Sequence, residues 1–421
     1  MASKTLAEKL PAFSRYQIFL IAVLGFIQFT VILDFMVMAP LGAILMPRLG
    51  ITPAQFSHVV SAYAFAAGGA GLLAAGFADK YDRKKLMLFF YVGFLVGSVC
   101  CGLAQSYEML LVARIITGIF GGVISAVGMA IITDVFAPEK RGRVMGYVQM
   151  SFAASQVLGI PIGLVLANHW NWHAPFLMIA GIGVLAGLII VRFMRPVSGH
   201  LHLHVDTDPW QHLWKTLIQP RYLLPFLTVA ILSTGGFMMM PFATTFLVNN
   251  VGITEAQLPL IFFVTGLCSM VIFPTVGRLS DSIGRLRTFA FGSIISVLVV
   301  AWYSNLGPTA VWLVIVINAA MFVGIGSRMV SWSALMTEIP TMKERGSFMA
   351  LTSSIRQLGG GLAASLAGVI VVQQGNGPLE HYDILGYTCC ATMLICWWLV
   401  SRVDKQAKLK PAAPPVAAAA A

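Results

Sequence analysis

Residues 277–285 have the sequence Gly-Arg-Leu-Ser-Asp-Ser-Ile-Gly-Arg, and residues 75–84 have the related sequence Ala-Gly-Phe-Ala-Asp-Lys-Tyr-Asp-Arg-Lys. The acidic residues at their centres, Asp79 and Asp281, are 202 residues apart. Three further pairs recur at an offset of 204 residues: Thr133 with Thr337, Asp134 with Glu338, and Arg141 with Arg345. A nearly constant offset indicates a structural unit duplicated in parallel, an organisation typical of transporters.

Composition places the chain in a membrane. Of its 421 residues 58% are hydrophobic and 10% are charged, whereas soluble domains carry about 25% charged residues. Apolar stretches long enough to cross ~30 Å of hydrocarbon recur with short polar breaks. They predict an all-α membrane protein of twelve transmembrane helices in two pseudo-symmetric six-helix bundles. The predicted spans lie near residues 16–40, 57–78, 86–104, 109–133, 144–167, 174–194, 222–248, 258–278, 288–304, 309–336, 347–372 and 384–403.

This pattern divides the chain into four parts. We expect an N-terminal six-helix bundle over residues 1–194 and a C-terminal one over 222–403. A central cytoplasmic loop over 195–221 joins them, and residues 404–421 form a disordered tail rich in Pro and Ala. No cleavable signal is expected, because the apolar run after Arg15 is about 25 residues long and suits a first span.

The basic residues predict the orientation. The net charge is +11, with 27 Lys and Arg, of which three fall within predicted spans. Only Arg48 falls in a connection on the side away from the termini, and the other 23 lie on the side of both termini. The positive-inside rule makes that side cytoplasmic. Topology therefore explains the basic charge, and we expect no nucleic-acid partner.

Asp34 is the only acidic residue deep within a predicted span. It lies six residues from the outer end of the first span, or ~9 Å, and Arg114 lies six residues beyond Glu108 at the outer start of the fourth. The two are at equal depth and could pair. A carboxylate that alternates between Arg114 and a proton would couple proton flow to transport. The alternative is a permanently ionised structural pair.

Two arginines of the second half have no deep carboxylate to neutralise them. Arg356 lies ~13 Å into the eleventh span, and Arg328 lies eight residues from the cytoplasmic end of the tenth. In a cavity, both would suit an anionic or zwitterionic group of a substrate. For Arg328 the alternative is snorkelling to the interface.

Polar and adaptable apolar side chains of the first, fifth and seventh spans are candidate cavity residues. Aromatic and sulfur side chains suit hydrophobic or varied ligands, although many of them will face lipid or neighbouring helices. The candidates are Gln28, Gln156, Phe29, Met38, Phe237 and Met240.

The loop sequences quoted above resemble those of the major facilitator superfamily, and the resemblance covers nearly the whole chain. The second-half loop has the family's G-x-L-x-D-x-x-G-R pattern, whereas the first-half copy has Ala75 and Asp82 where glycine is usual. Residues 110–122 are similar to the family's fourth-span motif, with Arg114 as the central arginine. Residues 159–163 resemble the fifth-span Gly/Pro motif of exporters in the drug:proton antiporter branch, without the adjacent Gly-Pro pair.

The duplicated charges have two interpretations. Carboxylates at cytoplasmic helix ends can face a neighbouring helix N-terminus and pair with basic loop residues. Such contacts could clasp the halves in one conformation and release them in another; alternatively, the loops are basic only for topology. The candidate gating residues are Asp79, Arg83, Asp134, Arg141, Asp281, Arg285, Glu338 and Arg345. Gly159, Pro161 and Gly163 permit close helix packing or a kink.

Other motifs give weaker signals. Histidines alternate in the central loop at His200, His202 and His204, where a solvated loop is a better interpretation than a metal site. The six cysteines lie in apolar stretches without metal-ligand spacing, so we expect small buried hydrophobes. No Walker A loop or catalytic constellation is present in the sequence, so we expect neither an enzyme nor a cofactor.

Together these features predict a proton-coupled secondary transporter in a bacterial-type inner membrane. We expect it to act as a monomer and to export a small amphiphilic or drug-like solute by alternating access. One alternative is an exporter or importer of a defined anionic or zwitterionic metabolite such as a siderophore, sugar or lysolipid. A more remote one is a non-transporting membrane receptor or scaffold, which would need neither a deep Asp/Arg pair nor duplicated loop carboxylates.

Overall fold

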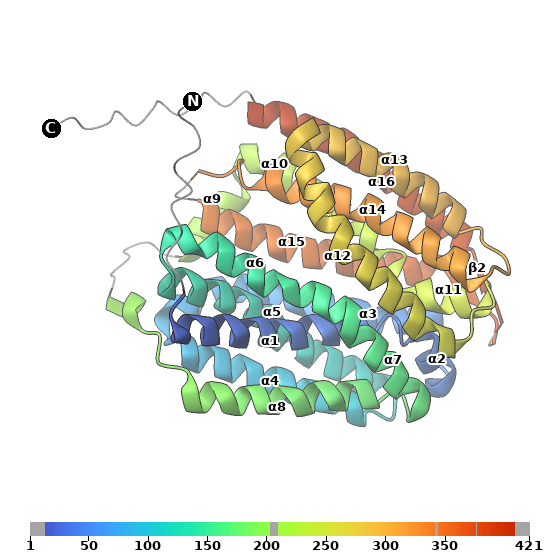
Figure 1. The fold of residues 1–421 in the computed structure, drawn as a ribbon, viewed down its shortest axis with the longest axis horizontal. Coiled ribbons are helices and arrows are strands. Elements are labelled where there is room, and N and C mark those ends of the chain that lie inside the picture. Colours follow the sequence, from blue (N-terminus) through green and yellow to red (C-terminus); the bar gives the residue numbers. More distant parts are fainter. Residues whose placement is uncertain (1–12, 203–208, 342–343, 376, 409–421) are drawn as a thin grey trace.

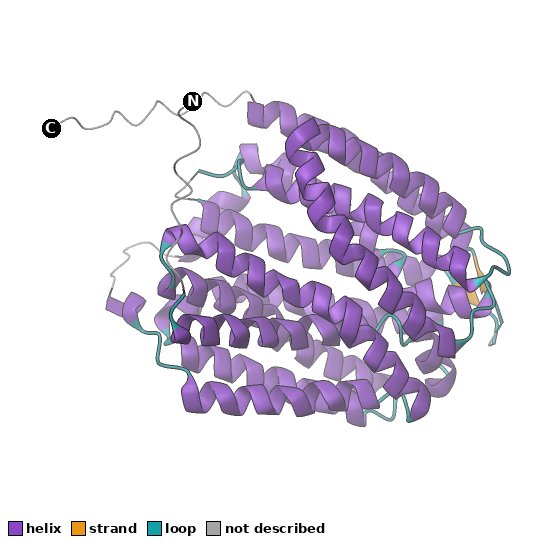
Figure 2. Ribbon diagram, in the orientation of Figure 1, coloured by secondary structure: helices purple, strands orange, loops and turns teal. Residues whose placement is uncertain are grey.

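The computed structural model describes residues 13–202, 209–341, 344–375 and 377–408. This part of the chain is almost entirely helical (Figure 2). Its principal elements are α1 (Arg15–Val37), α2 (Gly42–Leu49), α3 (Pro53–Phe77), α4 (Arg83–Leu103), α5 (Tyr107–Val135), α6 (Pro138–Ala154), α7 (Ile160–His169), α8 (Ala174–Phe193), α9 (Pro209–Leu217), α10 (Pro220–Phe237), α11 (Ala243–Asn249), α12 (Leu258–Ile283), α13 (Arg285–Tyr303), α14 (Val311–Met336), α15 (Arg345–Ile370) and α16 (Tyr382–Lys408). One short hairpin, β1 (Val372–Gln373) with β2 (Leu379–Glu380), precedes α16.

Eleven helical segments of the described residues are long and apolar enough to cross a membrane. The twelfth crossing is α15, which has 26 residues but a polar, glycine-rich sequence. It packs between α3 of the first half and α10 of the second. Protein neighbours therefore cover much of its surface, and it does not need the apolar surface of a lipid-facing helix. Together with α15, the described residues thus provide twelve helical crossings, in agreement with the sequence prediction.

Three spans are interrupted rather than continuous. A tight turn separates α1 from α2 in the first, and a 3-10 turn, η4 (Met240–Phe242), separates α10 from α11 in the seventh. In the fifth span a π-helical turn, η2 (Ser155–Gly159), separates α6 from α7. Pro161 follows this turn and has no backbone N–H, which fits a local departure from α-helical hydrogen bonding.

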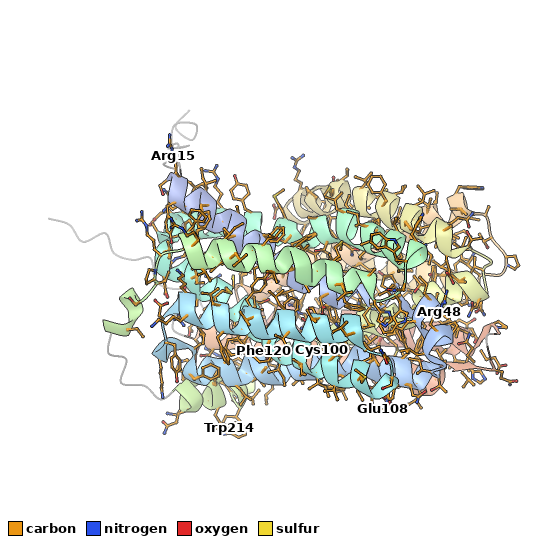
Figure 3. The ribbon with its side chains drawn as sticks, turned by 90° about the horizontal axis from the view of Figure 1, so that it is seen from below. Arg15, Arg48, Cys100, Glu108, Phe120 and Trp214 are labelled. Carbon is orange, nitrogen blue, oxygen red and sulfur yellow. The ribbon has the colours of Figure 1, made fainter. Side chains whose placement is uncertain are left out.

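The helices form two groups, α1–α8 and α10–α16, which we call the N-half and the C-half (Figure 1). Arg15 lies at one end of the molecule, and Arg48 and Glu108 lie at the other (Figure 3). We call these the inner end and the outer end. Contacts between the halves run from α3 to α15, from α7 and η2 to α12, and from α2 to α11. In Figure 1, α7 and α12 meet at the outer end, whereas α6 and α12 diverge towards the inner end.

Two details differ from the sequence prediction. The central connection is not wholly irregular, because it contains the amphipathic helix α9, which packs against both α3 and α15. The last helix continues to Lys408, five residues beyond the predicted end at Val403. Residues 409–421 of the predicted disordered tail lie outside the described part of the chain.

Candidate functional site

Asp34 and Arg114 form an ion pair in the interior of the N-half. Arg114 Nη1 donates to Asp34 Oδ2 at 2.7 Å and to the Asp34 backbone carbonyl at 3.3 Å. The Ser98 hydroxyl of α4 donates to Asp34 Oδ1 at 3.1 Å. Both charged side chains are completely buried. Equal depth on α1 and α5, argued from the sequence, thus corresponds to direct contact in the structure.

The remaining surface of the Arg114 guanidinium contacts an aromatic ring. Its central carbon lies 4.5 Å from the centroid of the Tyr63 ring of α3, within the range of a cation–π interaction. Gly118 on α5 permits this approach, because a Cβ there would lie 2.6 Å from the Tyr63 carbonyl oxygen. Arg114 Nε and Nη2 are buried and have no hydrogen-bond partner in the described residues. The carboxylate of Asp34 is therefore the main compensation for this charge.

The two halves are closed against each other at the outer end. Hydrogen bonds between described residues of the two halves hold this end together: the Asn168 amide donates to the Glu255 carbonyl at 2.9 Å, the Thr244 hydroxyl to the Ala39 carbonyl at 3.0 Å, and the Ser57 hydroxyl to the Ala364 carbonyl. Glycine permits the closest approach, because a Cβ at Gly368 would lie 2.4 Å from Ser57 Cβ. Small residues let backbones approach closely in this way in membrane helices.

One face of α15 changes from buried to exposed along the helix. Residues on this face are spaced by three or four positions, so they lie in one row. The row is exposed in the inner half of α15 at Met349, Ser353 and Arg356, and buried in the outer half at Gly360, Ala363 and Ala367. Protein covers the outer part of the row, and a guanidinium facing hydrocarbon would be costly. Arg356 therefore lies on the exposed part of this row, one turn from the point where protein begins to cover it.

Arg356 has no hydrogen bond or ion pair within the described ranges. Arg328 lies in a different environment, because it is buried within the C-half. Its guanidinium carbon lies 5.6 Å from the centroid of the Phe289 ring of α13, and Nη1 is close to Gly235 of α10. In this conformation Arg328 is therefore exposed neither to an open cavity nor at the membrane interface, and its role in substrate binding stays a prediction.

The other predicted cavity residues are divided between open and buried positions. Gln28 is half-buried, and its side-chain oxygen accepts from the Ser125 hydroxyl at 3.1 Å. Half-buried positions are also occupied by Phe29, Phe237 and Met240. By contrast, Met38 is completely buried and Gln156 is almost so. Met38 follows the last turn of α1 at the closed outer end, so it does not line an open space in this conformation.

The duplicated loop charges pair within each half. Arg83 Nε lies 3.0 Å from Asp134 Oδ2 in the N-half, and Arg285 Nη1 lies 2.5 Å from Glu338 Oε2 in the C-half. The pairs occupy corresponding positions in the duplicated unit. Each pair links the loop after the second membrane span of its half to the end of the fourth span of the same half. These two contacts therefore brace each bundle, and neither of them joins one half to the other.

Arg141 and Arg345, which also correspond in the two halves, share one structural role. Arg141 donates to the Thr133 carbonyl at 2.6 Å, and Arg345 donates to the Thr337 carbonyl at 3.2 Å. Each arginine thus satisfies a carbonyl at the C-terminal end of the preceding helix. Asp281 is exposed near the end of α12, and the side chain of Asp79 lies outside the described residues, as do those of His200, His202 and His204.

The sequence difference between the loop at residues 75–84 and the loop at residues 277–285 has a local explanation. Gly284 has a φ of 95°, a conformation that favours glycine. At the corresponding position Asp82 has a φ of −55° and acts as the N-cap of α4, where its side chain accepts from the Lys85 N–H at 3.0 Å. The N-half therefore replaces a glycine turn with a capping carboxylate.

Glu344 lies just before α15, outside the spans. Burial tends to raise the pKa of its carboxyl, but hydrogen bonds from Thr341 and Tyr222 and the charge of Arg221 act in the opposite direction. The result is a pKa below its ordinary range. This cluster ties the start of α15 to the start of α10 within the C-half.

The Gly/Pro motif of the fifth span packs against α1. A Cβ at Gly159 would lie 2.6 Å from Leu33 Cδ1, and one at Gly163 would lie 2.9 Å from Val37 Cγ2. Leu33 and Val37 flank Asp34 on α1. The motif thus brings the fifth span close to the helix that carries the buried carboxylate. The six cysteines are unpaired and buried or half-buried, as expected of small hydrophobes.

Comparison with solved structures identifies the same fold. A bacterial homologue of the human lysosomal transporter Spinster, in an inward-facing and unoccupied conformation, superposes with a TM-score of 0.72. The match covers 95% of this chain and all of that one at 17% identity. A POT family transporter in complex with a thioalcohol-conjugated peptide also gives a TM-score of 0.72, at 13% identity, covering 91% and 96% of the two chains.

Sequence relatives are membrane transporters. The MFS-type transporter YceJ of Bacillus subtilis is 27% identical over 64% of this chain and 68% of its own length. Multidrug resistance protein MdtG of Salmonella schwarzengrund is 28% identical over 53% of this chain and 56% of its own. Multidrug resistance protein 3 of Bacillus subtilis is 34% identical, over 36% and 30%. The family model of the Major Facilitator Superfamily matches residues 24–364 and 226–420. The chain therefore belongs to the Major Facilitator Superfamily, as a multi-pass membrane transporter and not an enzyme.

Proposed function

We propose that the protein is a proton-coupled secondary active transporter that exports a small amphiphilic solute across a bacterial inner membrane by alternating access. Both termini lie in the cytoplasm, so the inner end faces the cytoplasm and the outer end faces out. The observation that carries the proposal is the completely buried ion pair between Asp34 and Arg114.

The chemistry of this pair suits a proton carrier. An ionised carboxylate in the membrane interior is costly unless it is paired, and a protonated one is not. Asp34 can thus exchange its Arg114 partner for a proton when the surroundings change, which is the elementary step of proton coupling. A purely structural link between α1 and α5 would need no titratable group, since small or apolar residues pack membrane helices well.

The surroundings of Arg356 favour a substrate with an acidic group. The side chain is exposed in the inner half of α15 and has no acidic partner within the described residues. Phe237 lies one turn away, against Gly360, and offers an apolar surface. An anionic head beside an apolar body fits this arrangement. The same arrangement also supports a second candidate function, which is transport of one defined anionic or zwitterionic metabolite in either direction.

The names of relatives such as MdtG support export of drug-like solutes. The two candidates differ in breadth of substrate rather than in mechanism. A broad exporter accepts structurally unrelated amphiphiles, whereas a metabolite transporter accepts one compound and close analogues.

Purified protein in liposomes with an imposed pH gradient tests the proposal. A panel of fluorescent amphiphiles would include ethidium, which is cationic, and anilinonaphthalene sulfonate, which is anionic. We expect gradient-driven movement of at least one amphiphile, preferably an anionic one, and its loss when a protonophore collapses the gradient. Movement that persists unchanged with the protonophore would exclude proton coupling. Movement of a single metabolite, with the amphiphiles excluded, would select the second candidate.

A further inference from the structure

The outer end of the N-half contains a cavity of about 360 Å³, a volume within the range of small-molecule sites. We call it the outer cavity. It lies between α2, the connection from α4 to α5, and the end of α7 with the connection to α8. Among the described residues that line it are Ile44, Arg48, Leu49, Asn171, Trp172 and His173. Neither the buried ion pair nor Arg356 belongs to this lining, so the outer cavity is distinct from both.

Arg48 is the basic residue of the outer cavity, and neither topology nor helix capping accounts for it. It is the only Lys or Arg in the predicted outer connections, where the positive-inside rule disfavours a basic residue. The end of α2 is already capped, because the N–H groups of Gly50 and Ile51 both donate to the Met46 carbonyl. Arg48 is exposed and has no hydrogen bond or ion pair with a described residue. Its guanidinium is therefore available to a ligand.

The Asn171 side chain, in the connection from α7 to α8, adds further hydrogen-bond donors. Asn171 Oδ1 accepts from the backbone N–H groups of His173 and Ala174, at 3.1 Å each. These two bonds determine which end of the amide is the oxygen. The NH2 group of Asn171 makes no hydrogen bond within the described part of the chain, and it remains free to donate.

Aromatic and aliphatic side chains supply the apolar part of the lining. The His173 ring is oriented by its Nε2, which donates to the Ala104 carbonyl at 2.8 Å, and it stacks on the Trp172 ring at 3.7 Å between centroids. Ile44 and Leu49 of α2 add aliphatic surface. No Asp or Glu is among the described residues that line the outer cavity. The lining therefore combines an unpaired cation and free donors with an apolar surface.

We propose that the outer cavity binds an organic anion, in which a phosphate or carboxylate group is joined to a small apolar body. The Arg48 guanidinium provides the charge and the planar set of donors that suits such an oxyanion, and the Asn171 NH2 group adds donors. Trp172, Ile44 and Leu49 contact the apolar body. A neutral molecule of the same shape lacks the charge-assisted hydrogen bonds and binds more weakly. This site goes beyond the proposed function and does not depend on it.

Two sources can present this chemistry at the outer end. One is a soluble organic anion, and the other is the phosphate headgroup of an anionic phospholipid. Phenyl phosphate serves as the soluble probe and neutral benzyl alcohol as its uncharged counterpart. Nanodiscs of phosphatidylcholine or of phosphatidylglycerol distinguish the lipid source from the soluble one.

Protection of a cysteine in the outer cavity measures binding without any transport. The six native cysteines are replaced by alanine, and Gln105→Cys places one thiol at an exposed position of the lining. Its rate of reaction with N-ethylmaleimide, a neutral reagent, is recorded in phosphatidylcholine nanodiscs. We expect phenyl phosphate to slow this reaction and benzyl alcohol to leave it nearly unchanged. Glu380→Cys, exposed in β2 of the C-half at the same end of the molecule, is the control and should react at a constant rate (Figure 1).

Two variants test the residues that hold the anion. Arg48→Gln removes the charge, and Asn171→Asp keeps an oxygen that can accept from the N–H groups of His173 and Ala174 but replaces the free NH2 group with a negative charge. Each should raise the concentration of phenyl phosphate that gives half of the slowing by at least about tenfold, as expected for loss of a hydrogen bond to a charged group. Glu108→Gln is the matched control, because it removes an exposed charge at the same end that does not line the outer cavity, and it should leave this concentration nearly unchanged.

The lipid arm assigns the source. A slow reaction of Gln105→Cys in phosphatidylglycerol without added phenyl phosphate, restored to the faster rate by Arg48→Gln, would support the site and identify a lipid headgroup as its ligand. Slowing by phenyl phosphate alone would support the site and identify a soluble anion. The proposal would be overturned if neither slowed the reaction, or if Arg48→Gln and Asn171→Asp left the slowing unchanged. The proposed function would stand in either of these last cases, because neither Asp34 nor Arg114 is altered.

Discussion

Removal of one partner of the buried pair should be far more damaging than removal of both. In Asp34→Ala, the Arg114 guanidinium keeps its charge at a completely buried position but loses its 2.7 Å contact. Nε and Nη2 already have no partner in the described residues, and the groups left beside the guanidinium, the Asp34 carbonyl and the Tyr63 ring, are neutral. Loss of one member of a buried pair costs about 3–5 kcal/mol. At about 2–4 °C per kcal/mol for a unit of this size, Tm should fall by about 6–20 °C.

The double variant Asp34→Leu/Arg114→Met provides the decisive comparison. Replacement of a buried pair by apolar residues of similar volume is often neutral or stabilising, so its Tm should lie within about 4 °C of the unmodified protein. Tm is measured by intrinsic fluorescence in detergent, with the exposed Glu108→Ala as control. If Asp34→Ala melts within about 2 °C of the unmodified protein, or if the double variant is as unstable as the single one, the reasoning is refuted.

Three further predictions concern the C-half. Arg356→Lys keeps the charge but loses the planar fork, so it should lower the affinity for an anionic substrate about tenfold, and Arg356→Ala should lower it further. The affinity for a neutral analogue should hardly change. Equal losses of affinity for both ligands would show that the residue has a structural role. Arg285→Leu should lower Tm by only about 0–4 °C, since the pair with Glu338 is largely exposed, and a larger fall would show that the loop does more than brace one bundle. Glu344→Gln should be less stable than the unmodified protein at pH 7, and this difference should shrink as the pH falls below 4.5, because the folded pKa lies below that ordinary value; a difference that is constant with pH would contradict this.

The buried pair could be predicted from sequence because both charges are rare in apolar spans. Asp34 and Arg114 each lie six residues from the outer end of a span, so depth alone brings them to the same level. The repeated loop charges could be predicted for a similar reason, since the same residues at a fixed offset occupy equivalent positions. Both predictions depend only on the spacing of residues along the chain.

Properties that depend on helix rotation and crossing could not be predicted in this way. Arg328 and Arg356 look alike in sequence, but Arg328 on α14 is buried in the core of the C-half and Arg356 on α15 is exposed. Tyr63 was not identified as a site residue, because its contact with Arg114 depends on the close crossing of α3 and α5 at Gly118. The available signal was the presence of a tyrosine, Tyr63, in a span with few polar residues and near the depth of Asp34.

The central claim is tested most directly by comparing two rates in the Asp34→Asn variant: solute exchange at equal pH and proton-driven accumulation of solute. The variant and the unmodified protein are reconstituted in liposomes with the amphiphile that the panel identifies. The account predicts that Asp34→Asn loses gradient-driven accumulation, because asparagine keeps the shape of the side chain but exchanges no proton. It should retain solute exchange at equal pH on both sides, which shows that the protein is folded and binds. Full proton-driven accumulation by Asp34→Asn would contradict the account and leave the pair with Arg114 a structural contact.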